Sequence, residues 1–286
     1  MAQTMKQKVY ISDVEQLSPE QLESLLESAE QGDAAAMHQY AVQLFVKDDS
    51  DCVSWLKKAV RLKHVEATAD LGMLFTYGIH VKKDEKYGFQ LLKRAAESKN
   101  SYAQMNLGLC FLYGKGTKRN YKQAAYWFAQ AVEQGNMDAV YELAECYFSG
   151  CGVKQDMELA CRMYLDAAEN GNVEAMNALG SCYMSGNGVE KDELQGLCWT
   201  QKAAEAGYFE AMMSLAHIYM FGTEKIMRDH TLARRWMRAA VEAGCLKEDD
   251  KVEDALGFLD MLDDLKSQGV SGEIKLSQAI LHNPNL

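Results

Sequence analysis

A few short stretches of this 286-residue sequence combine residue types that could do chemistry. Gly114-Lys115-Gly116-Thr117 resembles part of a phosphate-binding loop, in which backbone amides and a lysine hold a phosphate group. The full pattern G-x-x-x-x-G-K-[ST] is absent, and the residues before Gly114 have the pattern of a helix where that motif needs a strand. We therefore interpret the segment as a turn that ends a helix.

Ser54 and Lys57 have the S-x-x-K spacing of serine β-lactamases, in which the serine is the nucleophile. The companion S-D-N and K-T-G motifs are absent. Trp55 lies at a core position of the same helical pattern, which predicts that Ser54 and Lys57 belong to an ordinary helix.

Histidines and cysteines supply no catalytic or metal-binding pattern. The six histidines are scattered, without H-E-x-x-H spacing, and neither G-x-S-x-G nor C-x-x-C occurs. Cys110, Cys146 and Cys182 recur at one helical position, about 10 Å apart if the helices stack, whereas a disulfide needs Cα atoms within about 7 Å. We expect these thiols, with Cys161 and Cys198 on the following helices, to be free, small buried residues. The sequence predicts no catalytic residues, no metal and no cofactor.

The elements that carry these residues repeat along the chain. A pair of small residues recurs at steps of 36 residues, with 37 at the last step. The pairs are Ala59-Val60, Ala95-Ala96, Ala131-Val132, Ala167-Ala168, Ala203-Ala204 and Ala240-Val241. Such a period indicates a stacked array in which no unit buries its apolar face alone.

One unit, residues 100–135, predicts two helices. Asn100 or Ser101 can cap the first, and Ala103, Leu107 and Phe111 then share one helical face. Gly108 allows a neighbouring helix to approach closely, and the turn from Gly114 ends the helix. A second helix carries Trp127 and Phe128 and ends at Gln134-Gly135.

The repeated pattern A-x-x-x-L-G-x-x-Y-x-x-G-x-G-V-x-x-D, followed by A-x-x-W-x-x-A-A-x-x-G, resembles the Sel-1-like repeat (SLR) family, a relative of tetratricopeptide repeats. Residues 171–207 show it most fully, and the resemblance covers about residues 32–244. It implies an all-α fold, a right-handed α/α superhelix of helix-turn-helix repeats, with roles in assembling complexes and in signalling. Some cysteine-rich members have been described as β-lactamases, which keeps a β-lactamase-like hydrolase open as an alternative.

The sequence predicts three parts: an N-terminal tail and capping helix (1–31), an array of about six repeats with a truncated first unit (32–246), and an acidic C-terminal capping helix and tail (247–286). Ser18, Pro19 and Gln21 form a helix-start pattern with a capping box. A basic cluster precedes the acidic part, and we expect it to be a solvated helix face that pairs with the acidic cap, with an anion-docking site as the alternative. Its members are Arg228, His230, Arg234, Arg235 and Arg238.

The net charge of −11 disfavours duplex nucleic acid and anionic membranes as partners and favours a basic peptide or protein. No run of about 18 apolar residues could cross a bilayer. The first residues lack the apolar core of a secretory signal, so a cytoplasmic location is expected. We expect a monomer, with self-association through an end repeat as an alternative.

In tetratricopeptide-like stacks the first helix of each unit lines a concave surface, and the resemblance implies the same here. Positions on that helix outside the core stripe vary between units and are often large and apolar, which is typical of an interaction groove. The candidate groove residues are Met73, Met105, Leu109, Leu112, Tyr141, Glu145, Phe148, Asn177, Met184, Met213, His217 and Met220. The alternative is that superhelical curvature buries them. The sequence thus predicts a non-catalytic adaptor that binds a peptide or protein segment in this groove.

Overall fold

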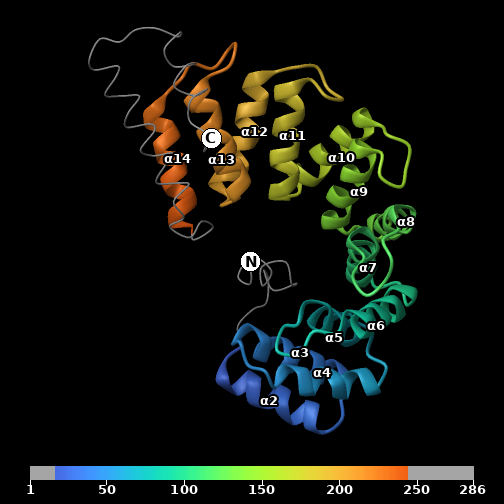
Figure 1. Cartoon of the computed structure of the whole chain (residues 1–286). Helices are drawn as coiled ribbons and strands as arrows, with labels where there is room; N and C mark the ends of the chain where they lie inside the picture. Colours follow the sequence, from blue (N-terminus) through green and yellow to red (C-terminus); the bar gives the residue numbers. More distant parts are fainter. Residues whose placement is uncertain (1–16, 244–286) are drawn as a thin grey trace. The chain divides into compact units, whose positions relative to one another are not determined.

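The computed structural model describes residues 17–243, and this part of the chain contains thirteen helices and no strand (Figure 1). The chain divides into two compact units, Met1–Asn170 and Gly171–Leu286. The all-helical class predicted from the repeat is confirmed for the described residues.

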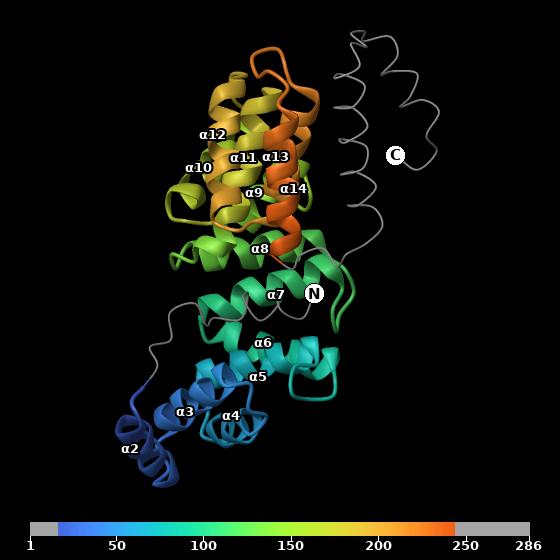
Figure 2. The same cartoon turned by 90° about the vertical axis from the view of Figure 1, so that its left-hand side faces the viewer.

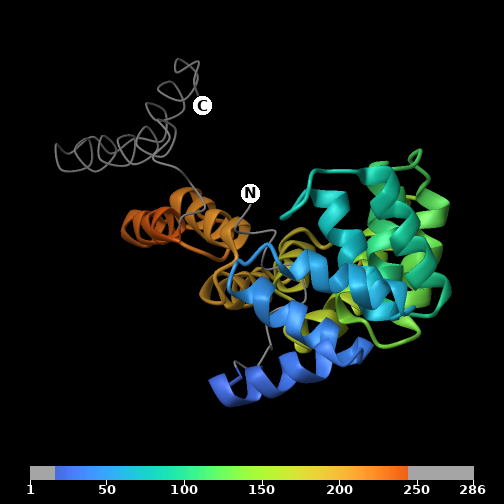
Figure 3. The same ribbon diagram turned by 90° about the horizontal axis from the view of Figure 1, so that it is seen from below.

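The first unit begins with a single helix, α2 (Pro19–Glu30), and continues with four pairs. The pairs are α3 (Ala34–Val46) with α4 (Cys52–Arg61), α5 (Val65–Tyr77) with α6 (Glu85–Glu97), α7 (Ser101–Tyr113) with α8 (Tyr121–Val132), and α9 (Met137–Ser149) with α10 (Met157–Glu169). Each second helix also packs on the first helix of the next pair within the unit, and α2 packs on α3 (Figure 3).

The second unit contains two further pairs. They are α11 (Val173–Ser185) with α12 (Glu193–Glu205), and α13 (Phe209–Phe221) with α14 (His230–Glu242). Helix α12 packs on α13, and the four helices lie side by side in chain order (Figure 1). Figure 2 shows the same four helices from another side.

Asparagine and aspartate caps explain where the helices begin. Asn100, Asn136 and Asn172 each accept a hydrogen bond, at 2.7–2.9 Å, from the backbone amide three residues later. The motif's closing aspartate has the same role for second helices, as Asp192 does for α12. The side-chain oxygen satisfies an amide that has no partner within the helix.

Left-handed glycines end most first helices. Gly114 has a φ of 74° and closes α7, and its amide donates to the carbonyl of Cys110. Residues with a side chain rarely adopt this conformation, which explains why the same glycine recurs in the motif.

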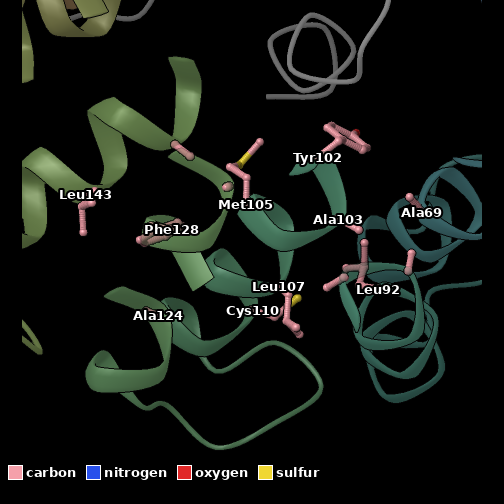
Figure 4. Packing of buried hydrophobic residues seen from close by; sticks show 14 of the residues in the cluster. Ala69, Leu92, Tyr102, Ala103, Met105, Leu107, Cys110, Ala124, Phe128 and Leu143 are labelled. Carbon is pink, nitrogen blue, oxygen red and sulfur yellow. The ribbon is translucent and has the colours of Figure 1, made fainter. Parts of the chain in front are cut away.

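The core of each pair lies between its two helices. Leu107 and Phe128 are fully buried, and Cys110 lies beside Leu107 in the same cluster (Figure 4). A Cβ atom on Gly108 would lie 2.5 Å from the Phe128 ring. The predicted role of Gly108 in close helix packing is therefore confirmed.

The predicted start of the N-terminal capping helix is also confirmed. Ser18 and Gln21 form a reciprocal capping box, and Pro19 is the first residue of α2. The predicted N-terminal tail up to residue 16 and the acidic segment 247–286 lie outside the described residues.

Candidate functional site

The two stretches that resemble catalytic motifs have ordinary structural roles. Gly114-Lys115-Gly116-Thr117 is the turn after α7, and the Lys115 ammonium lies 4.0 Å from the centre of the Tyr77 ring. Ser54 Oγ donates to the backbone carbonyl of Asp51, while Lys57 lies over the Phe75 ring. The interpretation of the first as a turn and of the second as a plain helix is confirmed.

No disulfide joins the cysteines of residues 17–243. Burial raises the pKa of Cys52 to about 11, and those of Cys110 and Cys146 to about 12, which disfavours the reactive thiolate. Cys198 is exposed on α12, so its predicted burial is wrong: its side chain lies on the outer side of the helix. Within residues 17–243 no three His, Cys, Asp or Glu side chains are grouped to hold a metal.

Two histidines that look unrelated in the sequence meet in the first repeats. His38 Nε2 lies 2.7 Å from Asp70 Oδ2, and the His38 and His64 rings are 5.0 Å apart. His64 caps α5, because its Nδ1 accepts a hydrogen bond from the backbone amide of Ala67. The pKa of His64 is lowered, mainly because the ring is partly buried and to a smaller extent because His38 is close. Sequence reasoning missed this cluster, because the pairing joins two helices.

Four of the candidate groove residues lie in the core of the first unit or against it. Met73 and Met105 are only 4 % and 6 % exposed and belong to the buried cluster. Figure 4 shows Met105 within it. Leu109 and Leu112 are half-buried and pack against the same cluster. The expected groove exposure of Met73 and Met105 is therefore wrong, since neighbouring helices cover both side chains.

Tyr164 of α10 contacts three candidate groove residues of α9, which are Tyr141, Glu145 and Phe148. Tyr164 is buried, and its ring centre lies 6.0 Å from that of Tyr141 and 6.2 Å from that of Phe148. The Tyr164 hydroxyl donates to Glu145 Oε1 at 2.5 Å. The sequence pattern predicts Tyr164 only as a core residue, so its hydrogen bond to Glu145 could not be predicted.

In the second unit, Met184, Met213 and His217 line one open depression of about 560 Å³ between α11 and α13. Its other lining residues are Ser181, Ser185, Thr200, Ser214 and Ile218. Thr200 contributes from α12. The lining combines apolar side chains with hydroxyls.

The two remaining candidate groove residues, Asn177 and Met220, do not line this depression. Asn177 lies one turn before Ser181 on α11, and its Oδ1 is buried without a hydrogen-bond partner. Met220 is half-buried against the cluster that includes Met237 of α14, so it serves packing between α13 and α14.

The basic cluster lies on and just before α14. Arg228 Nε donates to the carbonyl of Phe221, which closes the turn after α13. Arg235 and Arg238 are exposed on α14. Pairing with the acidic segment stays a prediction, because that segment is outside the described residues.

The repeat geometry agrees with comparison to known proteins. The Sel1 repeat profile matches residues 34–64, 65–100, 101–136, 138–172, 173–208 and 209–245. The chain belongs to the Sel1 repeat family.

Solved Sel1 repeat proteins show the same fold. One from Oxalobacter formigenes has 27% sequence identity and a TM-score of 0.68, over 78% of this chain and 99% of that chain. The protective antigen c5321, from uropathogenic Escherichia coli strains, has 29% identity and a TM-score of 0.68, over 88% of this chain and 53% of that chain. No functionally curated protein gives a significant match. The resemblance to the SLR family is thus confirmed.

Helices within residues 17–243 are all too short or too polar to cross a membrane. The Sel1 repeats here form a helical scaffold whose first helices carry the varied side chains.

Proposed function

We propose that this Sel1 repeat chain is a non-catalytic scaffold that binds a peptide or protein segment on the first-helix faces of its repeats. The observation that carries the proposal is the depression between α11 and α13, lined by Met184, Met213 and His217. Methionine side chains adapt their shape to a bound partner, and the surrounding hydroxyls can bond to its backbone.

The α9 face of the first unit is a separate candidate surface, considered by itself. Tyr141, Glu145 and Phe148 follow one another at helical spacing, and all three are partly exposed. The net charge of −11 favours a basic partner over nucleic acid or an anionic membrane. We further propose a cytoplasmic location and a monomeric state for the free protein.

The observed partners of Ser54 and Lys57 support a role without catalysis. Both side chains are exposed on α4 and contact other groups, so no base is held on the serine oxygen as a nucleophile requires. We expect turnover of a chromogenic β-lactam to be no faster with the wild type than with Ser54→Ala.

The test of the scaffold proposal is partner capture on the immobilised full chain, followed by affinity measurement with the purified partner. Met213→Ala combined with His217→Ala truncates the two largest polar or flexible side chains that α13 contributes to the depression, and leaves Ser214 and Ile218 in place. We expect this variant to weaken binding at least about tenfold, as the loss of contact-forming side chains at an interface centre does.

Gln201→Ala is the matched control, because Gln201 is exposed on α12 and does not line the depression. The control should bind as the wild type does. Equal affinity of all three proteins would place the partner elsewhere and contradict the assignment of this surface. Circular dichroism and the mass in solution would exclude unfolding and self-association as causes.

A further inference from the structure

Helices α9 and α10 carry a cluster of three aromatic rings around one carboxylate, formed by Tyr141, Glu145, Phe148 and Tyr164 (the α9–α10 aromatic cluster). The first three residues lie at i, i+4 and i+7, so they share one face of α9. Tyr164 lies beneath them on α10 and contacts both rings.

Stacking of the repeats does not need the hydrogen bond between Tyr164 and Glu145. One repeat earlier, Leu109 and Phe128 occupy the positions of Glu145 and Tyr164, and there Phe128 is part of an apolar cluster against which Leu109 packs. Relative to Phe128, Tyr164 adds only a hydroxyl, and that hydroxyl donates to the carboxylate that replaces the leucine. Phe128 is fully buried without either polar group, so burial at this position does not require them.

The carboxylate of Glu145 has no ion-pair partner among the residues that the structure describes. Among residues 17–243, no lysine, arginine or histidine forms an ion pair with it, although it is half-buried between aromatic rings. A carboxylate can accept about four hydrogen bonds, and Tyr164 uses one of these positions at Oε1. Asp138 and Glu142 on the same helix add negative charge around the cluster.

Aromatic faces and a carboxylate attract the same kind of ligand. The negative face of an aromatic ring attracts a cation, and a carboxylate adds a charge-assisted hydrogen bond. A guanidinium group suits both partners, because it is planar, stacks on rings and donates in a fork to a carboxylate. An ammonium group lacks the planar fork.

We propose that the α9–α10 aromatic cluster binds the guanidinium group of an arginine side chain on the partner peptide. The Glu145 carboxylate accepts from the guanidinium, and the rings of Tyr141 and Phe148 flank it. This inference rests on the proposed scaffold function and adds the chemistry of one anchor residue.

The test uses N-acetyl-arginine methylamide as the probe, titrated into the full chain while the aromatic NMR signals are recorded. We expect saturable shifts at the rings of Tyr141 and Phe148. The citrulline analogue, which has the same shape without the charge, should bind at least about tenfold more weakly, because charge-assisted bonds and cation–π attraction both require the cation. The lysine analogue should also bind more weakly than arginine.

Two variants test the carboxylate. Glu145→Gln keeps the size and an oxygen that can accept from Tyr164, and should remove the preference for arginine over citrulline. Glu145→Leu with Tyr164→Phe reproduces the apolar pair of the preceding repeat, so it should fold normally and lose the arginine-dependent shifts.

Equal shifts with arginine and citrulline, or unchanged arginine binding by Glu145→Gln, would overturn the inference. Arginine shifts confined to other residues would do the same. The scaffold proposal is judged separately by partner capture and the α13 variants, so the loss of arginine recognition would leave it standing.

Discussion

At the residue scale, one buried carboxylate shows how a single side chain holds a repeat in place. Glu193, the first residue of α12, is only 4 % exposed. It accepts from the Thr223 hydroxyl at 2.6 Å and from the Lys225 amide at 2.9 Å, and it pairs with the Lys191 ammonium. Thr223 and Lys225 lie in the turn after α13, so Glu193 ties the start of α12 to the next repeat's turn.

This carboxylate makes the stability of the second unit sensitive to acid. The pKa of Glu193 is lowered to about 2 from a usual 4.5. The largest cause is the hydrogen bond from Thr223, followed by those from Lys191 and from the Lys225 amide. The folded pKa is the lower one, so the stabilisation is complete above about pH 4.5 and is lost as the pH falls towards 2. We expect Glu193→Gln to lower the unfolding temperature at pH 7 and to reduce the further fall towards pH 2, followed by circular dichroism.

Glu190→Gln is the control for this change, because Glu190 is exposed in the preceding turn. It should leave the pH dependence of unfolding as in the wild type. An acid dependence of Glu193→Gln as steep as that of the wild type would contradict the assigned role.

At Gly108, the two packed helices of the pair leave no room for a side chain. A methyl group there would meet the fully buried ring of Phe128, and cores resist such overpacking. We expect Gly108→Ala to lower the free energy of unfolding by about 1–2 kcal/mol, the cost of overpacking less the gain in helix propensity. Urea unfolding measures this, with the exposed Lys122→Ala as a control that should change it by less than about 0.5 kcal/mol.

At the element scale, the ends of the second helices differ between early and late repeats. Gly135, Gly171 and Gly207 follow α8, α10 and α12 with positive φ. In the earlier repeats, Lys63 and Lys99 take the same left-handed conformation, with φ values of 64° and 63°. The same turn therefore forms at Lys63 and Lys99 without glycine, and the backbone of these two lysines is strained.

Exchanging the residue types at two equivalent turns should change stability in opposite directions. We expect Lys99→Gly to raise the free energy of unfolding by up to about 1 kcal/mol, because glycine adopts a positive φ without strain. Gly135→Ala should lower it by about 1 kcal/mol. A Cβ at Gly135 meets no atom within 4 Å, so its cost comes from the backbone alone. Thermal and urea unfolding would measure both, and the same sign for both changes would refute the argument.

At the scale of the whole molecule, the excess of acidic residues sets the field that a partner meets. With 41 acidic and 30 basic residues, the chain attracts positively charged partners before contact is made. Such attraction acts on the rate of association more than on the lifetime of a complex.

Salt should therefore slow binding of the captured partner. Raising the ionic strength from about 0.01 M to about 1 M shortens the screening length from about 30 Å to about 3 Å. We expect the association rate to fall with salt while the dissociation rate changes little, as measured by surface plasmon resonance. An association rate independent of salt would show that the partner is not recognised through its positive charge.

The repeat, the helix ends and the core stripe of this Sel1 repeat protein could be predicted from the amino-acid sequence alone. These features are local, because a cap such as Asn136 or a turn glycine such as Gly150 acts on residues within one helical turn. The 36-residue period then fixes which helices pair, so the fold followed from the pattern.

Which first-helix side chains are buried and which are exposed could not be predicted from the sequence and follows from the packing of neighbouring helices. Met73 and Met213 both lie on first helices outside the core stripe, yet one is buried and the other lines a depression. The hydrogen bond between Tyr164 and Glu145 likewise depends on what the neighbouring helix presents. The exposure of a helical position is set by the side chains packed across from it, and no periodicity within one helix contains that information.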